Sequence, residues 1–271
     1  MSKYYFEWII DLNKKHKNGV KFFGQDDKAK IPCGDEVPIS TGVRPSNRGV
    51  VAEADNRGLV TMDHDFHLAN LIPSVTLDCN IPSDLSGSFF IGDEDGNGQI
   101  FVTLKDATFD PSNVFDHCAQ LVDTIRKMAM NPTVLLLQTD GGPDHSLTRC
   151  ATKFAVIAMC KELDLDHIVV LRGAPNGSAR NKVERAMSVL NIPLSHAAVR
   201  RGVMPEWAEK DVKNCSSTKA VRELGEKTKT RREKAERDLP RLQQDYVKLV
   251  TREKGKHVLL FMHVAFSSSV Y

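Results

Sequence analysis

Residues 133–146 have the sequence TVLLLQTDGGPDHS, in which an apolar run meets a polar turn. Four apolar residues, 134–137, stand in a row, and turn-forming residues follow soon after. This pattern is typical of a strand that is buried on both faces. Asp140 would then lie at the C-terminal end of that strand, at the rim of a sheet, where open α/β folds place ligands. Alternatively, Asp140 only fixes the turn, because Asp-Gly pairs are common in turns.

The composition is that of an ordinary globular protein, but the charge is unevenly distributed. The chain has 271 residues, 41% apolar and 27% charged, with a net charge of +2. Residues 200–256 carry 17 basic and 10 acidic side chains, net +7, whereas the remainder carries 20 and 25, net −5. An acidic body with a basic extension favours a core that binds cations and an arm that contacts a polyanion. A solvated charged helix would have the same composition.

The distribution of residue types predicts three parts and an intracellular protein. We expect a core over residues 1–199, a basic and mainly helical extension over 200–256, and an apolar tail over 257–271 of open role. Six cysteines without a Cys-x2-Cys pair indicate reduced thiols. We expect no membrane contact, since no signal peptide is evident and no apolar run approaches about 18 residues. Residues 227–237, KTKTRREKAER, fit a nuclear import signal, a DNA-binding arm or a solvated helix.

Apolar periodicity predicts the order of the elements along the chain. Helical spacing predicts helices over residues 2–17, 111–130, 147–162 and 179–190, and apolar runs predict strands over 20–25, 74–82, 99–105, 134–137 and 167–171. We expect strand 74–82 to be half-buried and to pair with 99–105, and strand 167–171 to be buried. Three strands that can pair antiparallel, followed by alternating helices and strands, predict an α/β protein with a mixed sheet flanked by helices. This is the element order of the ribonuclease H-like fold, here with a charged helical C-terminal extension.

Three carboxylates stand at chemically significant places in this order. Asp26 follows the first strand, Asp140 follows the fourth, and Glu184 lies on the helix after the fifth. Phosphoryl transfer on nucleic acids often uses two divalent cations, and hard ions such as Mg²⁺ or Mn²⁺ prefer carboxylate oxygens. Two aspartates at strand ends and a helix glutamate can converge to supply such ligands. The phase of the first strand does not distinguish Asp26 from Asp27, so Asp27 remains the alternative first carboxylate.

Two segments resemble the DDE transposase and retroviral-type integrase superfamily. These are residues 138–145, QTDGGPDH, and residues 175–185, in which a Pro-Asn-Gly loop precedes a helix carrying Glu184-Arg185. Members of the superfamily have a similar T-D-x-G stretch and a similar loop. Uncharacterised transposase-like proteins of animal genomes are similar to further segments of this chain, namely residues 26–28, 40–44, 63–66 and 102–106. The resemblance covers roughly residues 20–195.

The resemblance implies a metal-dependent DNA polynucleotidyl transferase or endonuclease. Asp26, Asp140 and Glu184 would be catalytic and would bind two divalent cations, Mg²⁺ or Mn²⁺, while water or a DNA 3′-hydroxyl attacks a phosphodiester. DNA as the partner, a nuclear location and a homo-oligomer belong to the same expectation. Candidates for holding DNA phosphates are His145, Arg172, Asn176, Asn181, Lys182 and Arg185. Each of them could instead be an ordinary polar residue of a turn, a helix start or the rim of the sheet.

One departure from the superfamily leaves alternatives open. Transposases usually carry a separate DNA-binding domain before the catalytic core, and the residues before Val20 are too few to form one. We therefore expect an active enzyme, a truncated or domesticated copy of one, or, as the alternative, a catalytically inactive nucleic-acid-binding remnant of a transposase. The fold alone also leaves open a ribonuclease H-like nuclease that acts on RNA.

Overall fold

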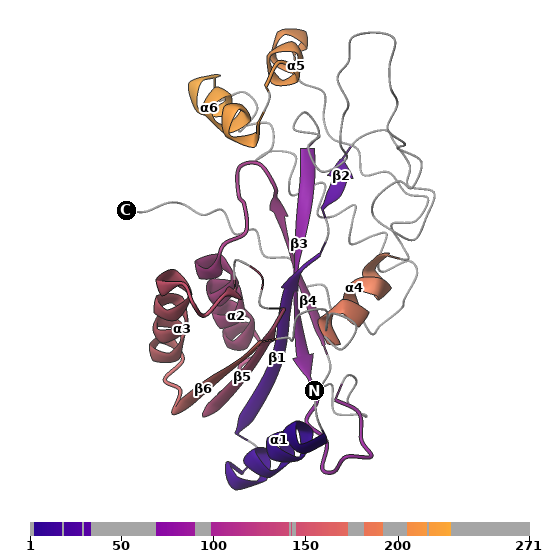
Figure 1. The fold of residues 1–271 in the computed structure, drawn as a ribbon, viewed down its shortest axis with the longest axis vertical. Helices are drawn as coiled ribbons and strands as arrows, with labels where there is room; N and C mark the ends of the chain where they lie inside the picture. The colour runs from indigo at the N-terminus through magenta and orange to yellow at the C-terminus, as the bar shows by residue number, and fades with distance from the viewer. Residues whose placement is uncertain are drawn as a thin grey trace.

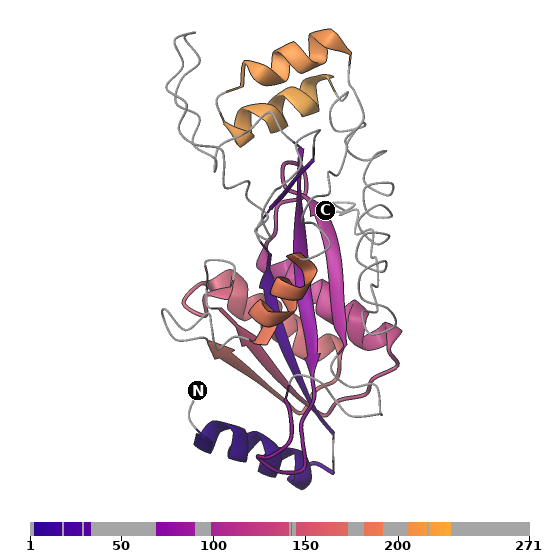
Figure 2. The same cartoon turned by 90° about the vertical axis from the view of Figure 1, so that its right-hand side faces the viewer.

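A six-stranded sheet forms the centre of the computed structural model, with helices on both of its faces (Figures 1 and 2). The structure describes residues 3–17, 19–28, 30–33, 69–89, 99–140, 142, 145–172, 182–191, 205–215 and 217–228. The strands are β1 (Val20–Asp27), β2 (Ile31–Cys33), β3 (Ala69–Cys79), β4 (Ile100–Asp106), β5 (Val134–Thr139) and β6 (His167–Arg172). The helices are α1 (Lys3–Lys15), α2 (Val114–Lys127), α3 (Cys150–Glu162), α4 (Lys182–Asn191), α5 (Glu206–Lys213) and α6 (Thr218–Thr228).

The strand pairing confirms the predicted mixed sheet. β3 pairs antiparallel with β1 and with β4, and β5 pairs parallel with β1 and with β6. The spatial order is therefore β4-β3-β1-β5-β6, and β2 pairs with β3 beyond the end of β1. The chain has the element order of the ribonuclease H-like fold, and β1 at its centre contacts both halves of the sheet.

Successive residues of β1 point to opposite faces of the sheet, and each face has its own core. Phe22 belongs to a cluster with Val183 and Leu190 of α4 and with Ile9 of α1. Phe23 belongs to a second cluster, which α2 and α3 cover. Figure 1 shows α4 on one side of the sheet and α2 with α3 on the other. Even-numbered residues of β1 therefore face α4, and odd-numbered residues face α2.

Two predictions about burial are wrong. β3 is buried from residue 71 to residue 79, although its alternating sequence predicted a half-buried strand. Its polar side chains face the α2 side of the sheet and find partners on α2 and on β1: Ser74 Oγ lies 3.2 Å from Nδ1 of His117 on α2, and the Thr76 hydroxyl accepts a hydrogen bond from Gln25 of β1. Strand β6 is only partly buried instead of fully buried, because it lies at an edge of the described sheet.

β1 extends two residues beyond its predicted end, so that Asp26 and Asp27 lie within the strand. A bulge follows, since three residues between Asp27 and Ile31 oppose only two on β3. The Lys28 N–H donates to the Pro73 carbonyl at 2.8 Å across this bulge. Proline lacks a donor and is tolerated in sheets at such irregular positions. The regular β1 ladder therefore ends directly beside the aspartates.

The described part of the charged extension consists of α5 and α6, which lie side by side beyond one end of the sheet (Figure 2). They pack together through Ala208, Val212 and Leu224, and Arg222 of α6 donates a hydrogen bond to the Thr108 carbonyl of the core. Residues 229–271, including the apolar tail, lie outside the described residues. Among the described helices, none combines the length and apolar character needed to cross a membrane.

Candidate catalytic site

The register of the sheet brings Asp26 and Asp140 together. Gln25 of β1 pairs with Thr139 of β5, so the next residues of the two parallel strands are the two aspartates. Neighbours of this kind point to the same face of a sheet. Both aspartates therefore lie on the α4 face, at the C-terminal ends of their strands. Asp26 is 8% exposed, whereas Asp140 is exposed at the rim.

A glycine allows α4 to approach this end of β1 closely. A Cβ atom built on Gly24 would lie 2.4 Å from Val183 Cγ2 of α4, well inside van der Waals contact. Glycine within a strand often marks such a close approach. Glu184, the next residue of α4, lies in the first turn of the helix and is half-buried. The third predicted carboxylate is thus carried to the same face as the two aspartates.

The pKa of Asp26 is raised, in part because the other two carboxylates lie close to it. Burial raises it, the charge of Asp140 raises it further, and Glu184 and Asp27 add smaller contributions, so that the pKa is about 7 instead of 3.8. The Asp27 N–H opposes the rise by donating to Asp26 Oδ1 at 2.8 Å. Like charges held close to a buried carboxyl disfavour its ionised form. A bound cation would relieve this repulsion.

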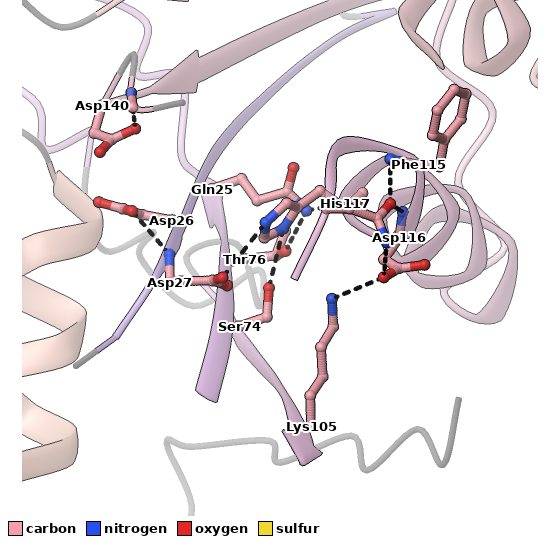
Figure 3. A network of polar contacts seen from close by, with 12 residues as sticks. Gln25, Asp26, Asp27, Ser74, Thr76, Lys105, Phe115, Asp116, His117 and Asp140 are labelled. Atoms are coloured by element: carbon pink, nitrogen blue, oxygen red, sulfur yellow. Dashed lines mark hydrogen bonds and ion pairs between the residues drawn. The ribbon is translucent and has the colours of Figure 1, made fainter. Parts of the chain in front are cut away.

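Asp27 points to the opposite face of the sheet, which favours Asp26 as the first carboxylate. Its Oδ2 lies 3.5 Å from Nε2 of His117 on α2 (Figure 3). Burial acts to raise the pKa of Asp27, but the His117 ring and the hydroxyls of Ser112 and Ser74 outweigh it and lower the pKa to about 2. Asp27 is therefore engaged away from Asp140 and Glu184.

Asp140 also fixes the turn that follows β5. Its Oδ1 accepts a hydrogen bond from the Gly142 N–H at 2.7 Å. A Cβ atom on residue 142 would lie 2.9 Å from Asp140 Oδ2, so glycine there leaves room for the carboxylate. The two interpretations offered by the sequence are thus compatible, because the turn holds the carboxylate beside Asp26.

Three of the candidate phosphate-binding residues have described side chains that are at least partly exposed. Arg172 is exposed at the end of β6 and pairs with Thr139 in the register. Arg185 is exposed on α4. The ammonium of Lys182 instead lies over two rings, 4.6 Å from the centroid of Phe89 and 5.2 Å from that of Phe6, and burial lowers its pKa. The two arginines are thus the better placed to contact a ligand.

His145 lies in a buried position and faces another histidine. It is 8% exposed, and its ring centroid is 4.6 Å from that of His117. Burial, followed by the neighbouring His117, lowers the pKa of His145 to about 4, so the ring is neutral at neutral pH. A buried neutral ring is poorly suited to hold a phosphate. Asn176 and Asn181 lie outside the described residues.

Two residues that the sequence analysis did not single out help to shape the site. Gly24 interrupts the apolar run of β1, and an isolated glycine in a strand is a known signal of close backbone approach. His117 occupies a position on the apolar face of α2, beside Cys118 and one turn after Val114. A polar residue on a buried helix face indicates a buried polar partner.

The donor atoms of the site fit hard divalent cations, although the site is not closed around one. All three predicted ligands are carboxylates, which Mg²⁺ and Mn²⁺ prefer. In the part of the chain that the structure describes, no group of three His, Cys, Asp or Glu side chains is arranged to hold a metal ion as it stands.

Replacing Asp26 with asparagine should stabilise the metal-free protein more at high pH than at low pH. The pKa of Asp26 is about 7 in the folded protein, against an ordinary value of 3.8. Protonation of Asp26 therefore stabilises the fold fully below pH 3.8, and this contribution to stability is lost as the pH rises through about 7. The gain in Tm of Asp26→Asn over wild type in EDTA should therefore grow between about pH 5 and about pH 8. The exposed Asp164→Asn serves as the control. A gain from Asp26→Asn that is constant over this range would contradict the prediction.

Sequence comparisons with known proteins identify no family for this chain. No protein-family model matches the chain, and no curated protein matches it. The chain is similar to a chain in the crystal structure of a pre-cleavage Mos1 transpososome, with 13% sequence identity and a TM-score of 0.36 over 91% of the present chain. The present chain spans 60% of the length of that one. A similarity at this level does not indicate a function, so the function is inferred from the chemistry of the site's own residues.

Proposed function

We propose that the protein is a metal-dependent DNA polynucleotidyl transferase or endonuclease of the DDE transposase and integrase type. The observation that supports this most is the raised pKa of Asp26, because its causes include the charges of both Asp140 and Glu184. A buried carboxyl whose pKa is raised by two neighbouring carboxylates, at the end of a central strand, is costly to the fold and is typical of functional sites. Their position in a ribonuclease H-like sheet agrees with this chemistry.

The carboxylates and the arginines of the site would have different roles in this reaction. Asp26, Asp140 and Glu184 would hold two Mg²⁺ or Mn²⁺ ions, which when bound supply Lewis-acid activation of the nucleophile and stabilisation of the leaving group. Asp26 is the most buried of the three, and its Oδ1 accepts the Asp27 N–H. Arg172 and Arg185 are exposed and would hold backbone phosphates through their guanidinium groups.

The proposal extends to the partner, the location and the assembly of the protein. DNA is the expected partner because the superfamily that the chain resembles acts on DNA and because residues 200–256 are net basic. A nuclear location follows from that role and from the basic segment 227–237. Assembly as a homo-oligomer follows from the same resemblance.

A cleavage and binding assay with the full chain tests the proposal. Mn²⁺ or Mg²⁺ is titrated into the protein with a labelled DNA duplex, and parallel arms contain EDTA or an RNA duplex. We expect nicking or strand transfer of DNA that requires the metal and stops in EDTA. Cleavage of RNA but not of DNA would assign the site to an RNA nuclease.

The open arrangement of the carboxylates is the observation that favours the alternative, an inactive nucleic-acid-binding remnant. This alternative predicts salt-sensitive DNA binding without metal binding or cleavage. It also predicts that deletion of residues 200–256 weakens DNA binding, because that segment carries the excess positive charge. Absence of Mn²⁺ binding together with such DNA binding would overturn the proposal and establish the remnant.

A further inference from the structure

A buried histidine on α2 joins two strands on the side of the sheet opposite the carboxylate site. His117 is 1% exposed, and its Nε2 lies 3.5 Å from Asp27 Oδ2 while its Nδ1 lies 3.2 Å from Ser74 Oγ (Figure 3). Its main-chain carbonyl accepts a hydrogen bond of 2.9 Å from the Gln25 side chain. Helix α2 is thus fastened to β1 on both sides of Asp26, and also to β3.

A second buried histidine continues this connection to the loop after β5. The rings of His117 and His145 lie with their centroids 4.6 Å apart at an interplanar angle of 42°. The His145 N–H donates to the Gly142 carbonyl at 3.0 Å, and the Gly142 N–H donates to Asp140 Oδ1 at 2.7 Å. At the Asp26 end of this series of contacts, the Asp27 N–H donates to Asp26 Oδ1.

These contacts form a continuous path between the two aspartates of the candidate site. The path leaves Asp26 through the backbone of Asp27, passes through the two histidine rings, and reaches Asp140 through Gly142. Each end is a backbone N–H that donates to the aspartate carboxylate. A shift of either histidine would therefore be transmitted, through Asp27 or Gly142, to a peptide N–H that contacts a carboxylate.

We propose that His117 and His145 are positioning residues, a strut on the α2 face of the sheet that fixes Asp26 and Asp140 relative to each other. Functional groups must be held within about 0.5 Å of a productive geometry, which requires supporting residues of this kind. The effect on metal binding rests on the proposed function, whereas the coupling of the two strand ends does not.

Hydrogen exchange of the Asp27 and Gly142 amides, measured by NMR in the full chain, tests the coupling. The variants are His117→Ala, His145→Ala and the double variant, with Val122→Ala as the matched control. Val122 is a buried core residue of the same helix that does not belong to the path. His117→Gln retains an amide group near the position of Nε2 and should restore part of the wild-type behaviour. A Mn²⁺ titration on the same samples gives the affinity.

We expect His117→Ala to speed exchange at both amides and to weaken Mn²⁺ binding about tenfold. The effect of the double variant should be smaller than the sum of the single effects, because both residues act through one path. Val122→Ala should lower Tm and change neither the Gly142 exchange nor the affinity. If His117→Ala fails to fold, His117→Gln and His145→Ala provide the same comparison.

The outcomes separate this inference from the proposed function. Unchanged exchange at Gly142 in His117→Ala overturns the strut, as does an unchanged Mn²⁺ affinity in a protein whose wild type binds Mn²⁺. If the wild type binds no Mn²⁺ and exchange still rises at both amides, the strut stands and the proposed function falls.

Discussion

Asp140→Asn and Glu184→Gln should each lower metal-dependent DNA cleavage about 10³-fold or more. An amide keeps the shape of the carboxyl group but supplies no negative charge to a divalent cation. Loss of about 4 kcal/mol of transition-state stabilisation corresponds to this factor. Initial rates with a labelled duplex at saturating Mn²⁺ measure the effect. The same substitutions should lower the pKa of Asp26, because Asp140 and Glu184 both raise it.

A matched control separates the loss of a ligand from a general change of charge. Asp164 is an exposed aspartate just before β6, in a left-handed backbone conformation with φ of 51°, which asparagine tolerates well. Asp164→Asn should therefore leave cleavage and folding unchanged. DNA binding should survive in all three variants, because it depends on the basic residues. Equal cleavage by wild type and Asp140→Asn would refute the assignment.

The sequence was sufficient to predict the elements that carry these carboxylates. The apolar run before Thr139 and the turn after Asp140 are local signals, and the structure places a buried strand there. The helical spacing that starts at Val114 likewise follows Asn113, whose side chain caps α2. Signals of this kind depend only on residues that are close in the chain.

The choice between Asp26 and Asp27 could not be predicted, because it depends on contacts between distant segments. Either residue fits the end of a strand, and the alternation of side chains assigns them to opposite faces. Which face holds the site is decided by α4, and which face holds a partner for the other aspartate is decided by His117 on α2. The burial of β3 was missed for the same reason, since His117 of α2 and Gln25 of β1 supply partners to its polar side chains.

Gly24→Ala should weaken Mn²⁺ binding and cleavage more than tenfold and destabilise the protein by about 1–3 kcal/mol. The added methyl group would lie 2.4 Å from Val183 Cγ2, and Val183 is fully buried. A valine in a helix has essentially one favourable rotamer, so it cannot turn away. The clash is relieved by an outward shift of α4, which carries Glu184 away from Asp26. Chemical denaturation and Mn²⁺ titration measure the two effects.

Removing the clashing methyl groups should reverse much of this loss. In the double variant Gly24→Ala/Val183→Ala, the losses of stability and of Mn²⁺ affinity should each be smaller than the sum of the losses in the two single variants. The difference should correspond to an interaction energy of about 0.5–3 kcal/mol. Gly19→Ala is the control, because its Cβ would meet Thr133 Oγ1 at 2.7 Å before β1 begins. It should cost stability without changing Mn²⁺ affinity. Additive effects of Gly24→Ala and Val183→Ala would show that Gly24 does not set the position of α4, and Glu184 would then need another support.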